Sequence, residues 1–220
     1  MKDFIGQEVG HEMNQPRFIT FTGVDANTDI GRCREIAMRW PVEWGCLIGG
    51  KLGNNRYPSL DVIIEASKHL RTALHVCRDH AAMANMGHYP ETYYRHKRLQ
   101  VNMATKQYDV PGLNDWAFEN RMPTILQTRG EFPAYVEGSW IQYLFDKSGG
   151  RGTLAETMPA APSDKLVGYA GGMNPDNVAG VVSTIRARNF WIDMETGVRD
   201  ENDWLDLDKV VAVCKAVYGG

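Results

Sequence analysis

The sequence predicts an α/β fold, a (β/α)8 barrel of the TIM type, because strand-like segments recur almost evenly along its 220 residues. Eight segments rich in β-branched and aromatic residues begin mostly about 25 residues apart, the length that a strand, a helix and two loops need. The segments span residues 18–24, 44–50, 72–78, 98–104, 124–128, 141–147, 166–172 and 190–197. No linker rich in proline, serine or glycine divides the chain. We therefore expect an N-terminal arm at residues 1–16 and one barrel domain at residues 17–220.

Several intervals between these segments carry helix signals. Asn174 is predicted to cap a helix whose first residue is Pro175, and valines at helical spacing follow. Ser59 precedes another apolar run with this spacing, and residues 210–217 form the last one. The interval at residues 129–140 is short and contains two glycines and a proline, so the fifth helix is predicted to be short or missing. An open, doubly wound sheet has the same alternation, and the spacing favours the barrel over it.

Composition excludes several classes of protein. With 24 basic and 27 acidic residues the net charge is −3, so no nucleic-acid partner is expected. Aromatic residues make up 10% of the chain, which is incompatible with a disordered protein. No apolar run approaches the roughly 20 residues of a membrane helix, and the polar N-terminus does not resemble a signal peptide. The four cysteines are scattered, without a Cys-x-x-Cys pair, which indicates a reduced cytoplasmic protein rather than a disulfide scaffold or a zinc ribbon.

Three predicted strand ends lead into loops that contain glycine, and two of them also carry acidic residues. The sixth strand ends at Asp146 before a glycine-rich loop, the seventh ends in a glycine pair, and the eighth continues into Thr196 and Gly197. Glycines let backbone N–H groups approach an anion, and the loops after strands seven and eight of such barrels frequently hold a phosphate. Ordinary turn formation is the alternative for each glycine alone. The predicted phosphate contacts are Gly150, Arg151, Gly152, Gly171, Gly172, Thr196 and Gly197.

These stretches closely resemble the phosphoribosylanthranilate isomerase family, (β/α)8 barrels of tryptophan biosynthesis. Residues 169–178 and 192–200 resemble its Ala-Gly-Gly-Leu-Asn-Pro-x-Asn-Val and Asp-Val-Ser-Ser-Gly-Val-Glu motifs. Residues 145–153 are similar to its strand-ending aspartate with the Gly-Gly-Thr-Gly loop, and residues 19–25 are similar to its Lys-Ile-Cys-Gly-Ile-Thr strand. The resemblance covers most of residues 17–218.

The resemblance implies an Amadori-type isomerisation of a phosphoribosyl amine, an internal oxidation and reduction that needs no cofactor or metal. An acid protonates the ribose ring oxygen, the ring opens to an iminium ion, and a base removes the proton from the neighbouring carbon. By resemblance Asp146 matches the general acid, for which its pKa would have to rise. Arg56 falls on the arginine that the family uses near the anthranilate carboxylate. A monomer or a homodimer is expected.

The predicted reactive centre departs from the family in three places. Thr22 stands where the family has its cysteine base, and a threonine hydroxyl cannot take a carbon-bound proton unaided. Arg199 replaces a glutamate, and Asn102 replaces a histidine. His75 or Cys77 at the end of the third strand could supply a replacement base, although a core or rim role suits the histidine better. A metal at that strand end lacks a further ligand at a persuasive spacing.

Three functional hypotheses follow from these observations. The first is a phosphosugar isomerase that acts on a phosphoribosyl amine, with Asp146 as general acid and Thr22 in the catalytic pocket. The second is an enzyme of the same barrel with altered chemistry on another phosphoribosyl or nucleotide-like substrate. The third is a non-catalytic barrel that binds a phosphosugar or a nucleotide. All three share a phosphorylated small molecule as partner, and the sequence leaves open whether the protein is an enzyme.

Overall fold

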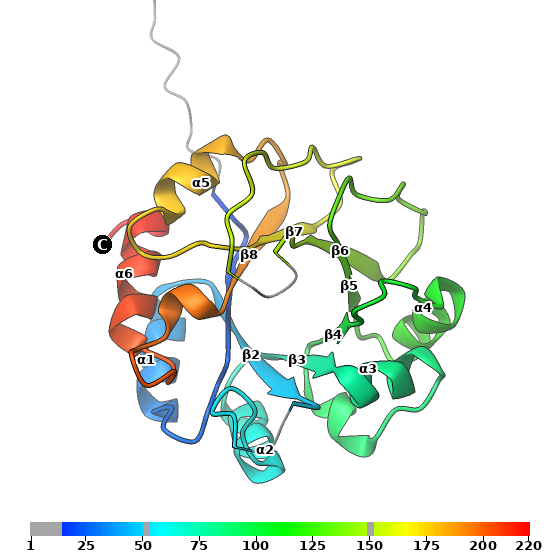
Figure 1. The fold of residues 1–220 in the computed structure, drawn as a ribbon, viewed down its shortest axis with the longest axis horizontal. Coiled ribbons are helices and arrows are strands. Elements are labelled where there is room, and N and C mark those ends of the chain that lie inside the picture. The colour runs from blue at the N-terminus through cyan, green and yellow to red at the C-terminus, as the bar shows by residue number, and fades with distance from the viewer. Residues whose placement is uncertain (1–14, 51–52, 149–151) are drawn as a thin grey trace, which may run out of the picture.

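Eight parallel strands form a closed barrel in the computed structural model, which describes residues 15–50, 53–148 and 152–220 (Figure 1). Each strand pairs with the next one along the chain, and the last strand pairs with the first. The strands are β1 Ile19–Thr22, β2 Val42–Ile48, β3 Thr72–Cys77, β4 Arg98–Asn102, β5 Thr124–Thr128, β6 Ile141–Phe145, β7 Val167–Ala170 and β8 Phe190–Met194. The closed order confirms the predicted (β/α)8 barrel and excludes an open sheet.

The helices lie on the outside of this barrel (Figure 1). They are α1 Ile30–Arg39, α2 Leu60–His69, α3 Arg78–Asn85, α4 Val110–Glu119, α5 Val178–Thr184 and α6 Leu207–Tyr218, with single 3-10 turns at η1 Glu91–Arg95 and η2 Thr196–Val198. No helix lies between β5 and β6, which confirms the prediction for the fifth helix. The described residues between β6 and β7, 146–148 and 152–166, also contain no helix, which the spacing did not indicate.

Aspartate side chains fix where α1 and α6 begin, whereas α5 begins at Val178 after its N-cap Asn177, three residues beyond the predicted cap at Asn174. Asp29 accepts a hydrogen bond from the backbone N–H of Arg32 at the start of α1, and Asp206 accepts one from Lys209 at the start of α6. Valines on one side of α5 and α6 are buried against the barrel. The predicted periodicity in these two helices therefore corresponds to their core-facing sides.

A buried ion pair lies inside the barrel. Arg98 on β4 donates to Glu43 on β2 with an Nη2–Oε1 distance of 2.5 Å, and both side chains are almost completely buried. The Arg98 guanidinium also stacks 4.4 Å from the ring centre of Trp191 on β8 and donates to Thr20 on β1. Burial would raise the pKa of Glu43, but the charges and hydrogen bonds of Arg98 and Arg71 bring it below its usual range. This cluster joins four strands from within.

The predicted arm at residues 1–16 lies outside the described residues except for its last two. Gln15 donates to the carbonyl of Val217, and Tyr218 donates to the carbonyl of Pro16, so the described chain begins against α6. The four cysteines are free thiols. In the part of the chain that the structure describes, no helix has the length and apolarity needed to cross a membrane.

Candidate functional site

A cavity of about 810 Å³ opens at the carboxyl ends of the strands. Residues of all eight strands line it, because the carboxyl ends of parallel strands meet at one end of a closed barrel. Its size lies within the range of small-molecule sites. The predicted site residues that line it are Thr22, Arg56, Asp146, Gly152, Gly171, Gly172, Thr196 and Gly197. Gly150 and Arg151 lie outside the described residues.

The carboxylate of Asp146 lies at the cavity wall directly after β6. Its backbone N–H donates to the carbonyl of Thr128 at 2.9 Å, which extends the β5–β6 pairing by one residue and fixes the position of the side chain. The hydroxyl of Ser148 donates to Asp146 Oδ1 at 2.7 Å. The residue is only 4% exposed, and it lines the cavity. Asp146 is therefore a buried carboxyl that a bound molecule can reach.

The three glycine loops that the sequence singled out contact one another beside Asp146. A Cβ atom on Gly172 would lie 2.3 Å from the backbone nitrogen of Leu154, and one on Gly197 would lie 2.0 Å from the carbonyl oxygen of Met173. Glycine is required at these two positions because the backbones approach so closely. The loops after β6, β7 and β8 thereby form one continuous wall of the cavity. Phosphate binding at this wall stays a prediction.

Thr22, at the end of β1, donates a hydrogen bond to Asp193 on β8. The Oγ1–Oδ1 distance is 2.7 Å, and both side chains are buried. Burial raises the pKa of Asp193 to about 7; the nearby carboxylates of Glu195 and Asp146 raise it further, while Thr22 and Arg98 oppose the rise. Asp193 lines the cavity and was not among the predicted site residues.

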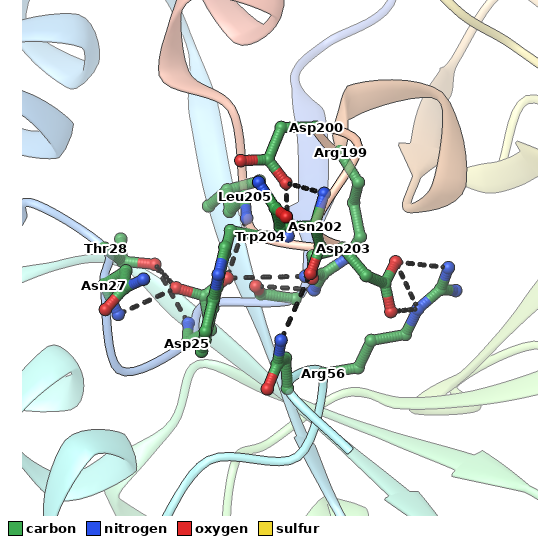
Figure 2. Close-up of polar contacts among 12 residues, drawn as sticks. Asp25, Asn27, Thr28, Arg56, Arg199, Asp200, Asn202, Asp203, Trp204 and Leu205 are labelled. Atoms are coloured by element: carbon green, nitrogen blue, oxygen red, sulfur yellow. Dashed lines mark hydrogen bonds and ion pairs between the residues drawn. The ribbon is translucent and has the colours of Figure 1, made fainter. Parts of the chain in front are cut away.

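Arg56, the predicted clamp for a substrate carboxylate, lies in the cavity wall but is engaged by two carboxylates of the protein. Its guanidinium donates to Asp203 through Nε and Nη2, each at 2.8 Å to the nearer oxygen (Figure 2). It also donates through Nη1 to Glu195 at 2.7 Å. A planar guanidinium fork that is already paired in this way has little capacity left for a ligand carboxylate.

Arg199 lies behind the cavity wall and holds the loop that presents Asp203. It donates through Nη2 to the carbonyl of Gly23 at 2.7 Å and through Nη1 to the carbonyl of Asp203 at 2.6 Å. Its charge faces the buried carboxylate of Asp25, which also accepts the N–H of Leu205 (Figure 2). Arg199 therefore holds in place the loop whose Asp203 side chain pairs with Arg56.

The two residues suggested as replacement bases are poorly suited to the task. His75 lines the cavity, but burial lowers its pKa to about 3, so its imidazole is a very weak base. Burial raises the pKa of the Cys77 thiol, so the thiol is protonated at neutral pH. The sulfur accepts a hydrogen bond from Asn102 at 3.5 Å. Among the described residues no group of three or more histidines, cysteines and acids is placed to hold a metal ion.

Two basic residues on the opposite wall were missed by the sequence reasoning. Lys106 and Arg129 follow β4 and β5 and line the cavity. Lys106 has a positive φ of 55° and donates to Gln127. Burial, followed by the charge of Arg129, lowers the pKa of Lys106. Neither residue forms an ion pair within the described ranges. Their shared position after adjacent strands was the signal that could have identified them.

Comparison with known proteins relates this barrel to solved structures. No protein-family model and no curated protein matches the sequence. Phosphoribosylanthranilate isomerase from Thermotoga maritima is 16% identical with a TM-score of 0.64, and the match covers 93% of this chain and 100% of that one. TrpF from Jonesia denitrificans is 18% identical, with a TM-score of 0.62 and coverage of 92% and 97%. The isomerase from Thermus thermophilus is 15% identical, with a TM-score of 0.60 and coverage of 90% and 96%. At these identities the likeness establishes the fold: this chain is a (β/α)8 barrel similar in structure to phosphoribosylanthranilate isomerases.

Proposed function

We propose that this protein binds a phosphoribosyl compound in the cavity and isomerises it by acid–base chemistry, with Asp146 as the general acid. The observation that carries the proposal is the position of Asp146, a buried carboxyl directly beside the glycine loops. A Cβ atom on Gly171 would lie 3.4 Å from Asp146 Oδ1, so the carboxyl and the loop wall are in contact. A sugar phosphate held by the loops would bring its ring within reach of Asp146.

The reaction divides into a step that opens the ring and a step at carbon. The protonated Asp146 carboxyl donates to the ring oxygen as the C1–O bond breaks, and the nitrogen lone pair on C1 forms the iminium ion. Ser148 donates to Asp146 and would stabilise the carboxylate that this transfer leaves. Loss of the C2 hydrogen then gives an enol, and its conversion to the ketone yields a 1-amino-1-deoxyketose. Such a reaction would place the protein in tryptophan biosynthesis, in the cytoplasm, as a monomer or a homodimer.

A solved structure with the same fold supports this class of ligand. A phosphoribosylanthranilate isomerase in complex with reduced 1-(o-carboxyphenylamino)-1-deoxyribulose 5-phosphate has a TM-score of 0.62 to this chain and is 16% identical over 93% of it. The ligand of that complex is a deoxyribulose 5-phosphate that carries a carboxyphenylamino group. The loops and Asp146 of this chain offer the groups needed for the sugar phosphate part of such a ligand.

A second candidate function is a barrel re-purposed for another phosphosugar or a nucleotide, without anthranilate isomerase activity. The observation that favours it is the engagement of Arg56 by Asp203 and Glu195. The carboxylate of an anthranilate group would have to displace one of these partners to reach the guanidinium. A ligand with hydroxyl or amide groups at that end would meet no such competition.

One pair of measurements tests the proposed function and separates the two candidates. We would measure turnover of N-(5′-phosphoribosyl)anthranilate and calorimetric binding of ribose 5-phosphate by the wild type, Asp146→Asn and the exposed control Asp115→Asn. Turnover that Asp146→Asn loses and Asp115→Asn keeps would support the isomerase. Binding of ribose 5-phosphate without turnover would support the re-purposed barrel. Neither binding nor turnover by the wild type would contradict both.

A further inference from the structure

We propose that Asp193 is the proton acceptor of this cavity and that Thr22 holds its carboxylate in place. This inference rests on the proposed function and supplies the base that the reaction at carbon needs. It assigns the residue at the family's cysteine position to a positioning role.

The barrel's closure brings the two residues together. β1 pairs with β8, with Thr20 opposite Asp193, so Thr22 lies one step farther along the same face of its strand. The Thr22 hydroxyl donates to Asp193 Oδ1 at 2.7 Å. No other hydrogen bond to the Asp193 carboxylate occurs between described residues, and Asp193 lines the cavity, so its second oxygen is left for a ligand.

The local packing fixes the Thr22 hydroxyl. Gly45 on β2 lies opposite Thr22, and a Cβ atom on Gly45 would come within 2.4 Å of Thr22 Oγ1. The absence of a side chain at this position on β2 gives the hydroxyl its place beside Asp193.

The charges around Asp193 suit a base that works near neutral pH. Glu195, which follows β8, and Asp146, which follows β6, both disfavour its ionised form, whereas Arg98 on β4 favours it. β7 presents the uncharged Ala170 opposite Asp193. Burial outweighs the hydrogen bond from Thr22, and the resulting pKa of about 7 is close to the value at which a general base is most effective.

The protons and electrons of the reaction balance, because the carboxyl groups of Asp193 and Asp146 accept and return the protons. Asp193 takes the C2 hydrogen as a proton, the electron pair of the C2–H bond forms the C1=C2 bond, and the iminium electrons return to nitrogen. Asp193 then gives its proton to C1, while the enol hydroxyl loses its proton and restores the protonated Asp146. No oxidant or co-reactant is needed, because C1 is reduced and C2 is oxidised within one molecule.

The test follows exchange of the C2 hydrogen of ribose 5-phosphate in D2O, measured by NMR across a range of pD. Ribose 5-phosphate opens its ring slowly in water, so this probe requires neither anthranilate nor the paired Arg56. We expect the wild type to catalyse the exchange with a rise near neutral pD, and Asp193→Asn to lose it by about 10²–10⁴-fold while Asp115→Asn keeps it. Calorimetry establishes that each variant binds the probe.

A matched pair of variants tests the role of Thr22. Thr22→Val removes the hydroxyl at constant shape and should move the rise of the rate to higher pH by about one pH unit, with a similar rate at the plateau. Thr22→Ser keeps the hydroxyl and should follow the wild type. This pair tests the role of Thr22 even where Asp193→Asn does not fold.

Three outcomes would overturn the inference. They are bound ribose 5-phosphate without exchange, undiminished exchange in Asp193→Asn, and identical pH profiles of the valine and serine variants. Absence of binding by the wild type would overturn the proposed function itself.

Discussion

Arg56 and Asp203 form a bidentate ion pair at the cavity wall, with two N–O distances of 2.8 Å. Only part of each side chain is exposed, and Glu195 binds the remaining guanidinium nitrogen at 2.7 Å. Arg56, which could otherwise bind a ligand carboxylate, is therefore held by the loop that follows β8. We therefore expect this loop to influence which ligand the cavity accepts.

Asp203→Asn should release Arg56 toward a ligand. We expect affinity for N-(5′-phosphoribosyl)anthranilate to rise by about tenfold, because a charge-assisted hydrogen bond to the ligand carboxylate replaces one within the protein. Affinity for ribose 5-phosphate, which has no carboxylate, should stay unchanged. Calorimetry with both compounds checks this. Equal gains for the two compounds would mean that the variant acts through the phosphate end instead.

Asp193→Asn should stabilise the fold at neutral and alkaline pH. The folded-state pKa of Asp193 is about 7, against 3.8 for an aspartate exposed to water, so the folded state binds more protons than the unfolded state between these pH values. Wild-type stability due to this group is therefore present below about pH 4 and falls as the pH rises to about 7. The full difference corresponds to about 4 kcal/mol. In urea unfolding, the free energy of unfolding of Asp193→Asn should exceed that of the wild type by an amount that grows from pH 4.5 to pH 8. A constant difference would contradict it, and Asp115→Asn serves as the control.

Much of the fold could be predicted from the sequence because its cause is local and periodic. The even spacing of most strand-like segments indicated crossovers of similar length, and the short interval at residues 129–140, with its two glycines and a proline, predicted a short or missing helix. Asp146 and the described glycines of the loops could be placed at the cavity because a residue at the carboxyl end of a barrel strand lies at that end of the barrel. These inferences needed only the position of a residue relative to its own strand.

The remaining features of the site depend on contacts between distant parts of the chain. Thr22 and Asp193 are 171 residues apart, and only barrel closure makes their strands neighbours. Arg56 and Asp203 are 147 residues apart, and their pairing depends on how Arg199 holds the last loop. Neither pair leaves a periodic pattern in the sequence. The pKa of Asp193 likewise follows from burial, which its neighbours in sequence do not reveal.

The buried pair of Glu43 and Arg98 should be a major determinant of stability. Glu43→Gln leaves the Arg98 charge buried without its partner, and we expect a loss of about 3–5 kcal/mol in the free energy of unfolding. Arg71 also pairs with Glu43, at 3.2 Å, but its side chain is 55% exposed. Arg71→Met should therefore cost less than about 1 kcal/mol. Denaturant unfolding of both variants checks the contrast, and equal losses would contradict the assignment of the stabilisation to the buried partner.

The glycine wall can be tested with a charge-only comparison at Gly152. This residue has a positive φ of 69°, a conformation that asparagine and aspartate tolerate better than most other residues. A Cβ atom there would lie 3.4 Å from that of Thr196, so both substitutions fit with little rearrangement. Asp and Asn have nearly the same shape, so the two variants differ in charge alone at the wall where the phosphate is predicted.

We expect Gly152→Asp to bind ribose 5-phosphate at least tenfold more weakly than Gly152→Asn at low salt, because the aspartate and the phosphate would be two like charges a few ångströms apart. The difference should shrink as the ionic strength rises, because salt screens this repulsion at a partly exposed site. Calorimetric titration at two salt concentrations measures both effects. Equal affinities of the aspartate and asparagine variants at low salt would place the phosphate elsewhere in the cavity, with the basic wall of Lys106 and Arg129 as the next position to examine by the same method.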